Sequence, residues 1–298
     1  MVTIIVGTYL VEKGLLTHEQ LEHLLSQQRR VHVKLGLIAV AEGLMMQEEA
    51  DEINRMQAVQ DKRFGDIAIE QGYLTEGQVE ALLTKQGNAY LMFAQALVDQ
   101  QFMTVDQLEQ CMMDFQFENE MTLSDMEDLK SGDVDRILPL YIPMGCEKYL
   151  DEMGTALRTI RRCVDTEIYL EKAFVTSRCE AEYGAIQCID GERRFSCGMV
   201  GSGQALLPIA SIFGEEEFEE MNEDALDAIG DLLNCISGIY ASALSRGGVL
   251  VELYPPEYSV EISGIVSDEM LVLPVHIKGQ KFYLAVAVGN KIEMDQEA

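Results

Sequence analysis

The stretch DAIGDLLNCISG, residues 227–238, lies at the centre of a segment with helical periodicity. From about residue 222 to 245, apolar residues recur every three or four positions, the spacing of one face of an α-helix. Asp231 and Asn234 fall on the opposite side, three positions apart, and are therefore neighbours on its surface. Gly230 and Gly238 flank them. Because glycine destabilises a helix by about 1 kcal/mol relative to alanine, we expect something to approach the backbone closely there.

The segments around this helix show the patterns of strands and turns. Before it come a helical pattern at 146–162, a strand at 166–175, a hairpin at 185–200 and a run of acids at 215–224. After it come four strands, at 249–254, 259–266, 270–277 and 281–288. Residues 284–288 are apolar on both faces, which is typical of a central strand. The sequence therefore predicts an α/β domain with a mainly antiparallel sheet and one long helix.

Residues 227–238 resemble the signature of the CheX-type chemotaxis phosphatases, a branch of the CheC, CheX and FliY family. The signature reads roughly D-A-hydrophobic-G-E-x-x-N-x-x-x-G, and the order of elements agrees over about residues 138–292. The resemblance implies an active-site helix that docks on a phosphorylated, CheY-like response regulator. There Asp231 pairs with a lysine of the regulator, and Asn234 orients the water that attacks the aspartyl phosphate.

The same resemblance implies that the partner supplies the Mg²⁺, so that the protein needs no cofactor of its own, and that two copies form a homodimer through the sheet. Asp231 departs from the signature, because the family has a glutamate there, one methylene longer. An Asp-x-x-Asn pair on a helix is usually an ordinary solvated pair. Two functions therefore stay open, a response-regulator phosphatase and a non-catalytic signalling adaptor.

The first third of the chain repeats with a period of 29 residues. Two glycine columns keep this spacing: Gly7, Gly36 and Gly65, and Gly14, Gly43 and Gly72. A fourth, degraded copy has Ala94 and Gln101 at these positions. Thr-x-x-Gln capping boxes at 17, 75 and 104 open the second helix of three copies. A fixed period predicts a helical repeat array, here four pairs of helices.

These patterns together predict an α+β protein with an all-α helical repeat domain at residues 1–120 and a CheX-like domain at residues 138–298. The interval between them shows no clear apolar period, and Ser131-Gly132-Asp133 indicates a break in it.

Residues 34–57 and 63–86 resemble the tandem motif in the N-terminal domains of type II secretion and pilus ATPases. In the MshE-type members of that family, paired motifs bind cyclic di-GMP. The resemblance implies a site made by the second and third copies, with the ligand-binding residues Lys34, Gly36, Gln57, Arg63, Gly65 and Gln86. Lys34 stands where the motif has arginine. The alternative is a helical packing or interaction module without a nucleotide.

Composition narrows the remaining possibilities. The net charge of −29 disfavours binding to DNA or RNA, because no bulk basic surface is available. No apolar run approaches the roughly 20 residues of a membrane span. The N-terminus lacks a basic region followed by an apolar core and a small-residue cleavage site, so we expect a cytoplasmic protein. None of the seven cysteines forms a C-x-x-C pair, and we expect free thiols and no metal site.

Overall fold

The computed structural model describes residues 1–28, 33–60, 62–260 and 262–295. The chain divides into two compact units, residues 2–133 and residues 134–298 with Met1. The division falls inside the interval that the sequence analysis left between its two domains. Helices α9 and α10 occupy that interval, although the sequence shows no clear apolar period there. Among the described helices, none is long and apolar enough to cross a bilayer.

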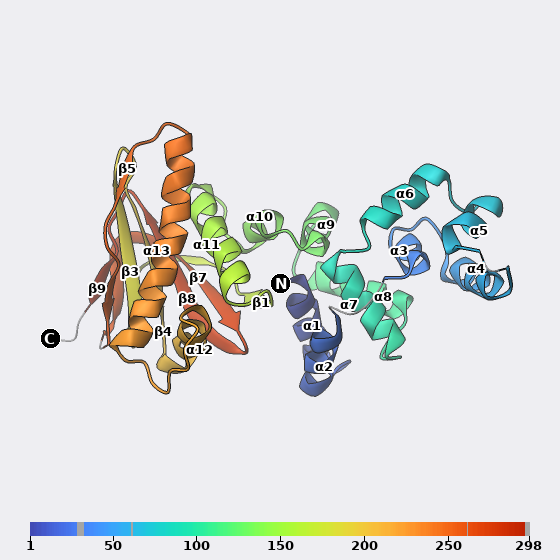
Figure 1. Ribbon diagram of the computed structural model, residues 1–298, viewed down its shortest axis with the longest axis horizontal. Helices are drawn as coiled ribbons and strands as arrows, with labels where there is room; N and C mark the ends of the chain where they lie inside the picture. Colours follow the sequence, from blue (N-terminus) through green and yellow to red (C-terminus); the bar gives the residue numbers. More distant parts are fainter. Residues whose placement is uncertain (29–32, 61, 261, 296–298) are drawn as a thin grey trace. The chain divides into compact units, whose positions relative to one another are not determined.

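The N-terminal unit consists of helices joined by short turns. They are α1 (Val2–Glu12), α2 (His18–Gln28), α3 (Leu35–Ala41), α4 (Gln47–Gln60), α5 (Phe64–Glu70), α6 (Glu76–Thr84), α7 (Ala89–Asp99), α8 (Val105–Glu118) and α9 (Leu123–Ser131). Helices α2, α4, α6 and α8 each begin 29 residues after the one before. The structure thus follows the period of the sequence (Figure 1).

The first glycine column lies where two helices of a pair pack closely. A Cβ added at Gly7 would contact Leu21, one at Gly36 would contact Ala50, and one at Gly65 would contact Val79. A Cβ at Gly36 would also lie 3.0 Å from the ring of Phe64. Each contact partner stands 14 residues after its glycine, so one packing geometry recurs in three copies. Helix packing alone therefore accounts for Gly36 and Gly65.

The second glycine column lies in the turn between the paired helices. Gly14, Gly43 and Gly72 have positive φ angles of 69°, 65° and 78°, the left-handed conformation that glycine adopts without steric cost. Gln101 of the fourth copy has a φ of 60° in the same turn. The fourth copy therefore keeps the left-handed turn although it has lost the glycine that favours it.

The capping boxes hold the start of the second helix. The hydroxyl oxygens of Thr75 and Thr104 accept from the backbone N–H groups of Gln78 and Gln107. The side-chain oxygens of the two glutamines in turn accept from the backbone N–H groups of the two threonines. The second copy has Met46 at this position, and its backbone N–H donates to the Glu49 carboxylate over 2.8 Å. Half of the box is therefore made even without a capping hydroxyl.

The C-terminal unit is one antiparallel sheet with helices on one face (Figure 1). The helical elements are α10 (Val134–Ile137), η1 (Leu138–Tyr141), η2 (Glu147–Tyr149), α11 (Leu150–Cys163), α12 (Gly203–Phe213) and α13 (Glu223–Arg246). The strands are β1 (Ile168–Leu170), β2 (Phe174–Cys179), β3 (Tyr183–Gly191), β4 (Phe195–Gly201), β5 (Val251–Leu253), β6 (Glu257–Ser259), β7 (Gly264–Ile277), β8 (Gln280–Val288) and β9 (Glu293–Asp295). The predicted fold class is confirmed.

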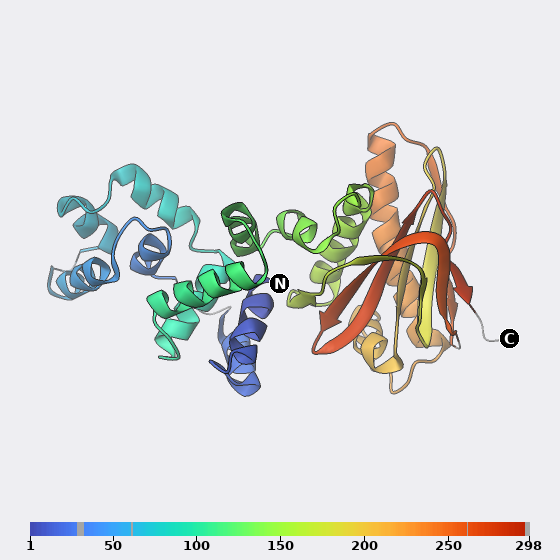
Figure 2. The same cartoon turned by 180° about the vertical axis from the view of Figure 1, so that it is seen from behind.

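The strands follow the order β1-β7-β8-β4-β3-β5, with β2 and β9 added to β7 and β6 added to β3. The start of β7 pairs with β2 and β9, and its second half pairs with β8. Strand β7 is curved (Figure 2). The face of the sheet away from α13 carries a buried core that includes Ile186, Val200, Ile265 and Ala285. Strand β8 is paired on both sides, as its apolar sequence predicts.

The other face of the sheet packs against α11, α12 and α13. Ile229, Leu232, Leu233 and Ile236 of α13 are fully buried on this side. The ring of Tyr240 meets Phe195 of β4 edge to face, with centroids 4.6 Å apart. These contacts hold α13 in a fixed rotation about its own axis, so that its polar side is turned outward.

Candidate functional site

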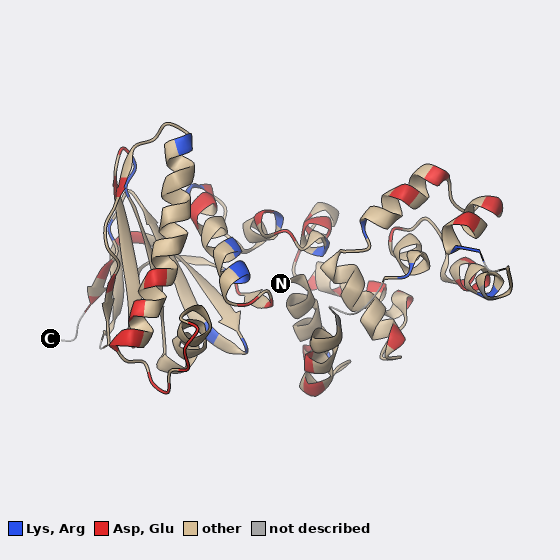
Figure 3. Ribbon diagram, in the orientation of Figure 1, with Lys and Arg blue, Asp and Glu red and all other residues tan. Residues whose placement is uncertain are grey.

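Helix α13 carries the residues of the predicted site, and its N-terminus is capped. The side chain of Asn222 accepts a hydrogen bond from the Ala225 backbone N–H over 2.9 Å, which caps the N-terminus. Glu223 and Asp224 lie in the first turn, where the helix dipole favours negative charge. Acidic residues gather on the N-terminal part of α13 and in the loop before it (Figure 3). The N-terminal part of the exposed side of α13 is therefore acidic.

Asp231 and Asn234 both lie on the exposed side of α13. The side chain of Asp231 makes no hydrogen bond or ion pair with any residue that the structure describes. Asp227 and Cys235, on the same side, are also exposed. The pair thus stands at an open surface, with one carboxylate free to accept an ion pair from another molecule.

Asn234 is held by a residue that the sequence analysis did not single out. The side-chain amide of Gln187, on β3, donates to Asn234 Oδ1 over 2.9 Å and to the backbone carbonyl of Tyr254 over 2.8 Å. Gln187 is 1% exposed. The signal in the sequence was a polar residue in the middle of the otherwise apolar run 185–189 of β3. One lone-pair direction of Oδ1 is taken by this bond, and the Asn234 amide N–H₂ remains available.

The two glycines of α13 have different surroundings. A Cβ at Gly230 would lie 3.4 Å from both Pro256 and Tyr258, so the expected close approach occurs there. At Gly238 no described residue makes such an approach, because nothing lies within 4 Å of the Cβ that it lacks. The segment 254–258 therefore runs along α13 beside the predicted pair. The negative charge of Asp227 raises the pKa of Tyr258 in this segment.

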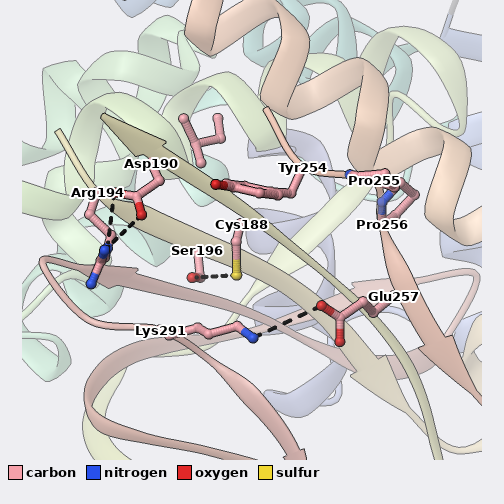
Figure 4. Close-up of a pocket in the computed structure, with 10 residues that line it drawn as sticks. Cys188, Asp190, Arg194, Ser196, Tyr254, Pro255, Pro256, Glu257 and Lys291 are labelled. Atoms are coloured by element: carbon pink, nitrogen blue, oxygen red, sulfur yellow. Dashed lines mark hydrogen bonds and ion pairs between the residues drawn. The ribbon is translucent and has the colours of Figure 1, made fainter. Parts of the chain in front are cut away.

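A cavity of about 470 Å³ lies on the other side of the same segment (Figure 4). Its lining includes Cys188 and Ser196, whose sulfur and oxygen atoms are 3.1 Å apart, and Tyr254. Its charged residues are paired with one another: Arg194 binds Asp190 over 2.6 Å, and Lys291 lies 4.0 Å from Glu257. Because Cys188 follows Gln187 in β3, the cavity faces away from Asn234.

The predicted nucleotide residues are only partly brought together. Gln86 Nε2 donates to the carbonyl of Val33 over 2.9 Å, which places the end of the third copy beside the start of the second. The Lys34 ammonium pairs with Asp99 over 3.1 Å. The side chains of Gln57 and Arg63 are exposed, and neither side chain bonds to a group of the described residues.

The hollow that Lys34 and Gly36 line has a volume of about 120 Å³. Ligand pockets usually measure about 300 Å³ or more. A dinucleotide would therefore have to lie mainly across the open surface of the repeats. The nucleotide site stays a prediction.

Comparison with known proteins finds neither a matching family model nor a matching curated protein. A CheC-like superfamily protein from Shewanella sp. PV-4 is 16% identical, with 48% of this chain and 97% of that chain covered and a TM-score of 0.43. The chemotaxis protein CheX from Desulfovibrio desulfuricans is 16% identical, with 48% and 99% covered and a TM-score of 0.42.

A structure of the CheX-CheY-BeF3-Mg²⁺ complex from Borrelia burgdorferi matches with 18% identity, 49% of this chain and 96% of that chain covered, and a TM-score of 0.36. CheC-, CheX- and FliY-like proteins are thus among the solved structures to which this chain is similar, and the similarity covers its C-terminal half.

Proposed function

We propose that the C-terminal unit dephosphorylates the aspartyl phosphate of a CheY-like response regulator in chemotaxis-type signalling. The observation that carries the proposal is the exposed pair on α13. Asp231 has no bonding partner among the described residues, and Asn234 presents a free amide N–H₂ beside it. A helix that buries its apolar side and leaves these two groups unused suits insertion into a partner's active site.

The chemistry asked of this chain is positioning. The regulator contributes the phosphoryl group and the Mg²⁺, so the roles left for the phosphatase are docking and orientation of water. The Asp231 carboxylate pairs with a lysine of the regulator and fixes the docked position. The Asn234 amide donates to the oxygen of the attacking water and holds it in line with the phosphorus atom. The acidic side of α13 also favours a partner that presents basic groups.

The test is phosphate release from a panel of phosphorylated response regulators. Asn234→Ala should lower the acceleration by one to several orders of magnitude, because water is no longer held in place. Folding should change little: Asn234 is exposed, and water can take its bond to Gln187, so we expect a loss of less than about 1 kcal/mol. Urea unfolding measures the second quantity.

Variants of Asp231 separate docking from water orientation. Asp231→Ala should mainly raise the concentration of phosphatase at half-maximal rate, because it removes the ion pair with the regulator. Asp231→Glu should preserve or increase the activity, since it restores the longer reach of the family residue. Asp227→Asn is the matched control: it removes one charge from the same side of α13 and should change the maximal rate by less than about twofold.

A non-catalytic adaptor is the second candidate, and the shorter carboxylate of Asp231 is the observation that favours it. An adaptor would bind a regulator without accelerating its phosphate loss. If the wild-type protein accelerates no regulator in the panel, and Asp231→Glu does not create that activity, the adaptor is the better account of this unit.

For the N-terminal unit we propose binding of cyclic di-GMP by the second and third repeats. The motif residues support this, together with the exposed and unpaired Arg63 guanidinium, which is available for a phosphate.

A further inference from the structure

Gln187 occupies a position where the fold calls for an apolar residue. It is the first member of a row that crosses four neighbouring strands. Gln187 pairs with Cys197 of β4, Cys197 pairs with Val286 of β8, and Val286 pairs with Leu271 of β7. Opposite residues of antiparallel strands point to the same face, here the face that α13 covers. All four residues are at most 1% exposed. Gln187 is the polar member of a buried row.

This side chain is also incompletely satisfied. Its Oε1 atom is buried and has no hydrogen-bond partner among the residues that the structure describes. A buried acceptor without a partner loses its bond to water and gains nothing in return, so it destabilises the fold. An apolar side chain of similar size would avoid this penalty. The fold alone therefore gives no reason to keep the Oε1 atom here.

The amide nitrogen of Gln187 is fully used. Its two hydrogens go to Asn234 Oδ1 at 2.9 Å and to the Tyr254 carbonyl at 2.8 Å. Both partners are acceptors, so this orientation of the Gln187 amide is the one the contacts require. It also fixes the Asn234 amide, because reversing that group would set two N–H₂ groups against each other.

We propose that Gln187 is a positioning residue, which orients the Asn234 side chain so that its N–H₂ group faces the docked regulator. The inference rests on the proposed function, in which Asn234 holds the attacking water. Gln187 itself is buried and touches neither the regulator nor the water. The bond to Tyr254 ties the same amide to the segment 254–258, which packs against Gly230 of α13. The amide is thus fixed to both the sheet and this segment before a partner arrives.

The first experiment replaces Gln187 by an apolar residue of similar length. In Gln187→Met, the maximal rate of phosphate release should fall about tenfold or more, because Asn234 is free to rotate. The concentration of phosphatase at half-maximal rate should change by less than about twofold, because the docking pair is intact. The free energy of unfolding in urea should change by less than about 1 kcal/mol, because removal of the unpaired Oε1 offsets the loss of the two bonds from Nε2. Gln95→Met, at an equally buried glutamine of the N-terminal unit, is the matched control and should leave the rate unchanged.

A double-mutant cycle tests whether Gln187 acts through Asn234. When Asn234→Ala is already present, adding Gln187→Met should lower the residual rate by less than about twofold, because the group that it positions is gone. A loss that multiplies with that of Asn234→Ala would overturn the inference. So would Gln187→Met with wild-type activity, while Asn234→Ala alone is inactive. Either outcome leaves the proposed function standing.

A second measurement does not depend on activity. The side-chain amide of Asn234, assigned by NMR through its loss in Asn234→Ala, should have two well-separated proton shifts in the wild-type protein. In Gln187→Met these shifts should move towards those of a solvent-exposed asparagine amide that is free to rotate about the side-chain χ angles. Unchanged shifts would overturn the inference, even if no regulator is found and the proposed function fails. If Gln187→Met does not fold, Gln187→Asn, which is one methylene too short to span both acceptors, takes its place with the same expected results.

Discussion

At the scale of single residues, Glu152 is a carboxyl group without a hydrogen-bond partner. It lies on α11, is 1% exposed, and neither of its side-chain oxygens is bonded among the described residues. Burial raises the pKa of this carboxyl well above its usual range, and the positive charge of Arg193 acts in the opposite direction. The folded chain therefore holds a proton over a pH range in which the unfolded chain has lost it.

This proton makes stability depend on pH. With a raised folded-state pKa, stability is lost as pH rises from the unfolded value, about 4.3, towards the folded one. Glu152→Gln should therefore raise the free energy of unfolding at about pH 8 by at least about 1 kcal/mol. A difference of less than one unit between the folded and unfolded pKa of Glu152 is enough to produce this change. At about pH 4 the difference should vanish. Urea unfolding at several pH values measures it, with amide exchange of β8 identifying the transition of this unit.

The control for this prediction is Asp151→Asn. Asp151 is the neighbouring acid in the same turn of α11 and is exposed. Its neutralisation should change stability by less than about 0.5 kcal/mol at either pH. A wild-type protein and a Glu152→Gln variant of equal stability at high pH would show that Glu152 is solvated or paired when ionised.

At the scale of elements, the turns of the repeats offer a direct test of local strain. Gln101 adopts a φ of 60°, in the turn where three other copies have glycine. A side chain in this conformation costs about 1 kcal/mol, part of which is offset because glycine loses more chain entropy on folding. Gln101→Gly should therefore stabilise the N-terminal unit by about 0.5 to 1 kcal/mol. Thermal unfolding of that unit provides the measurement.

Gln100 gives the matched control. It is exposed like Gln101 and precedes it directly, but its φ of −82° is right-handed. Gln100→Gly should destabilise the unit by up to about 1 kcal/mol. Glycine relieves no backbone strain at this position, and its greater loss of chain entropy on folding remains. Destabilisation by both substitutions would mean that the fourth turn does not carry the strain assigned to it.

The elements that depend on local pattern could be predicted from sequence. The periodicity of α13 and the Thr-x-x-Gln caps act within a few residues, and both agree with the structure. Contacts between distant segments could not be predicted in this way. The bond between Gln187 and Asn234 joins residues 47 positions apart, and it depends on the register of β3 and on the rotation of α13. The same limit explains why Gly230 is approached and Gly238 is not.

At the scale of the whole molecule, the two units carry two proposed sites, which raises the question of whether the sites are coupled. A ligand of the repeats could change the activity of the C-terminal unit only if it binds more tightly to one state of the protein than to another. By linkage, it would then change the affinity for the regulator by the same factor as the regulator changes the affinity for it. Coupling is therefore measurable from either side.

The nucleotide prediction comes first, because coupling requires binding. A dinucleotide with two phosphates must find local cations on a chain of net charge −29. We expect cyclic di-GMP to bind, and Arg63→Ala to weaken it by at least about 1.5 kcal/mol, as expected for bonds to a charged group. Gln86→Ala should weaken it similarly, but it also removes the bond to the Val33 carbonyl, so Arg63 is the cleaner probe.

Lys62→Ala is the control for Arg63→Ala, because Lys62 is the adjacent cation and already pairs with Glu70 over 2.6 Å. It should change the affinity by less than about twofold, since its charge is largely neutralised. Calorimetry with millimolar ligand that gives no heat and no thermal shift would reject the site. If binding is observed, phosphate release measured with and without cyclic di-GMP shows whether the two proposed sites are coupled. A changed half-saturating concentration must be matched by an equal change in nucleotide affinity, and no change in either would mean that the repeats bind their ligand independently of the phosphatase.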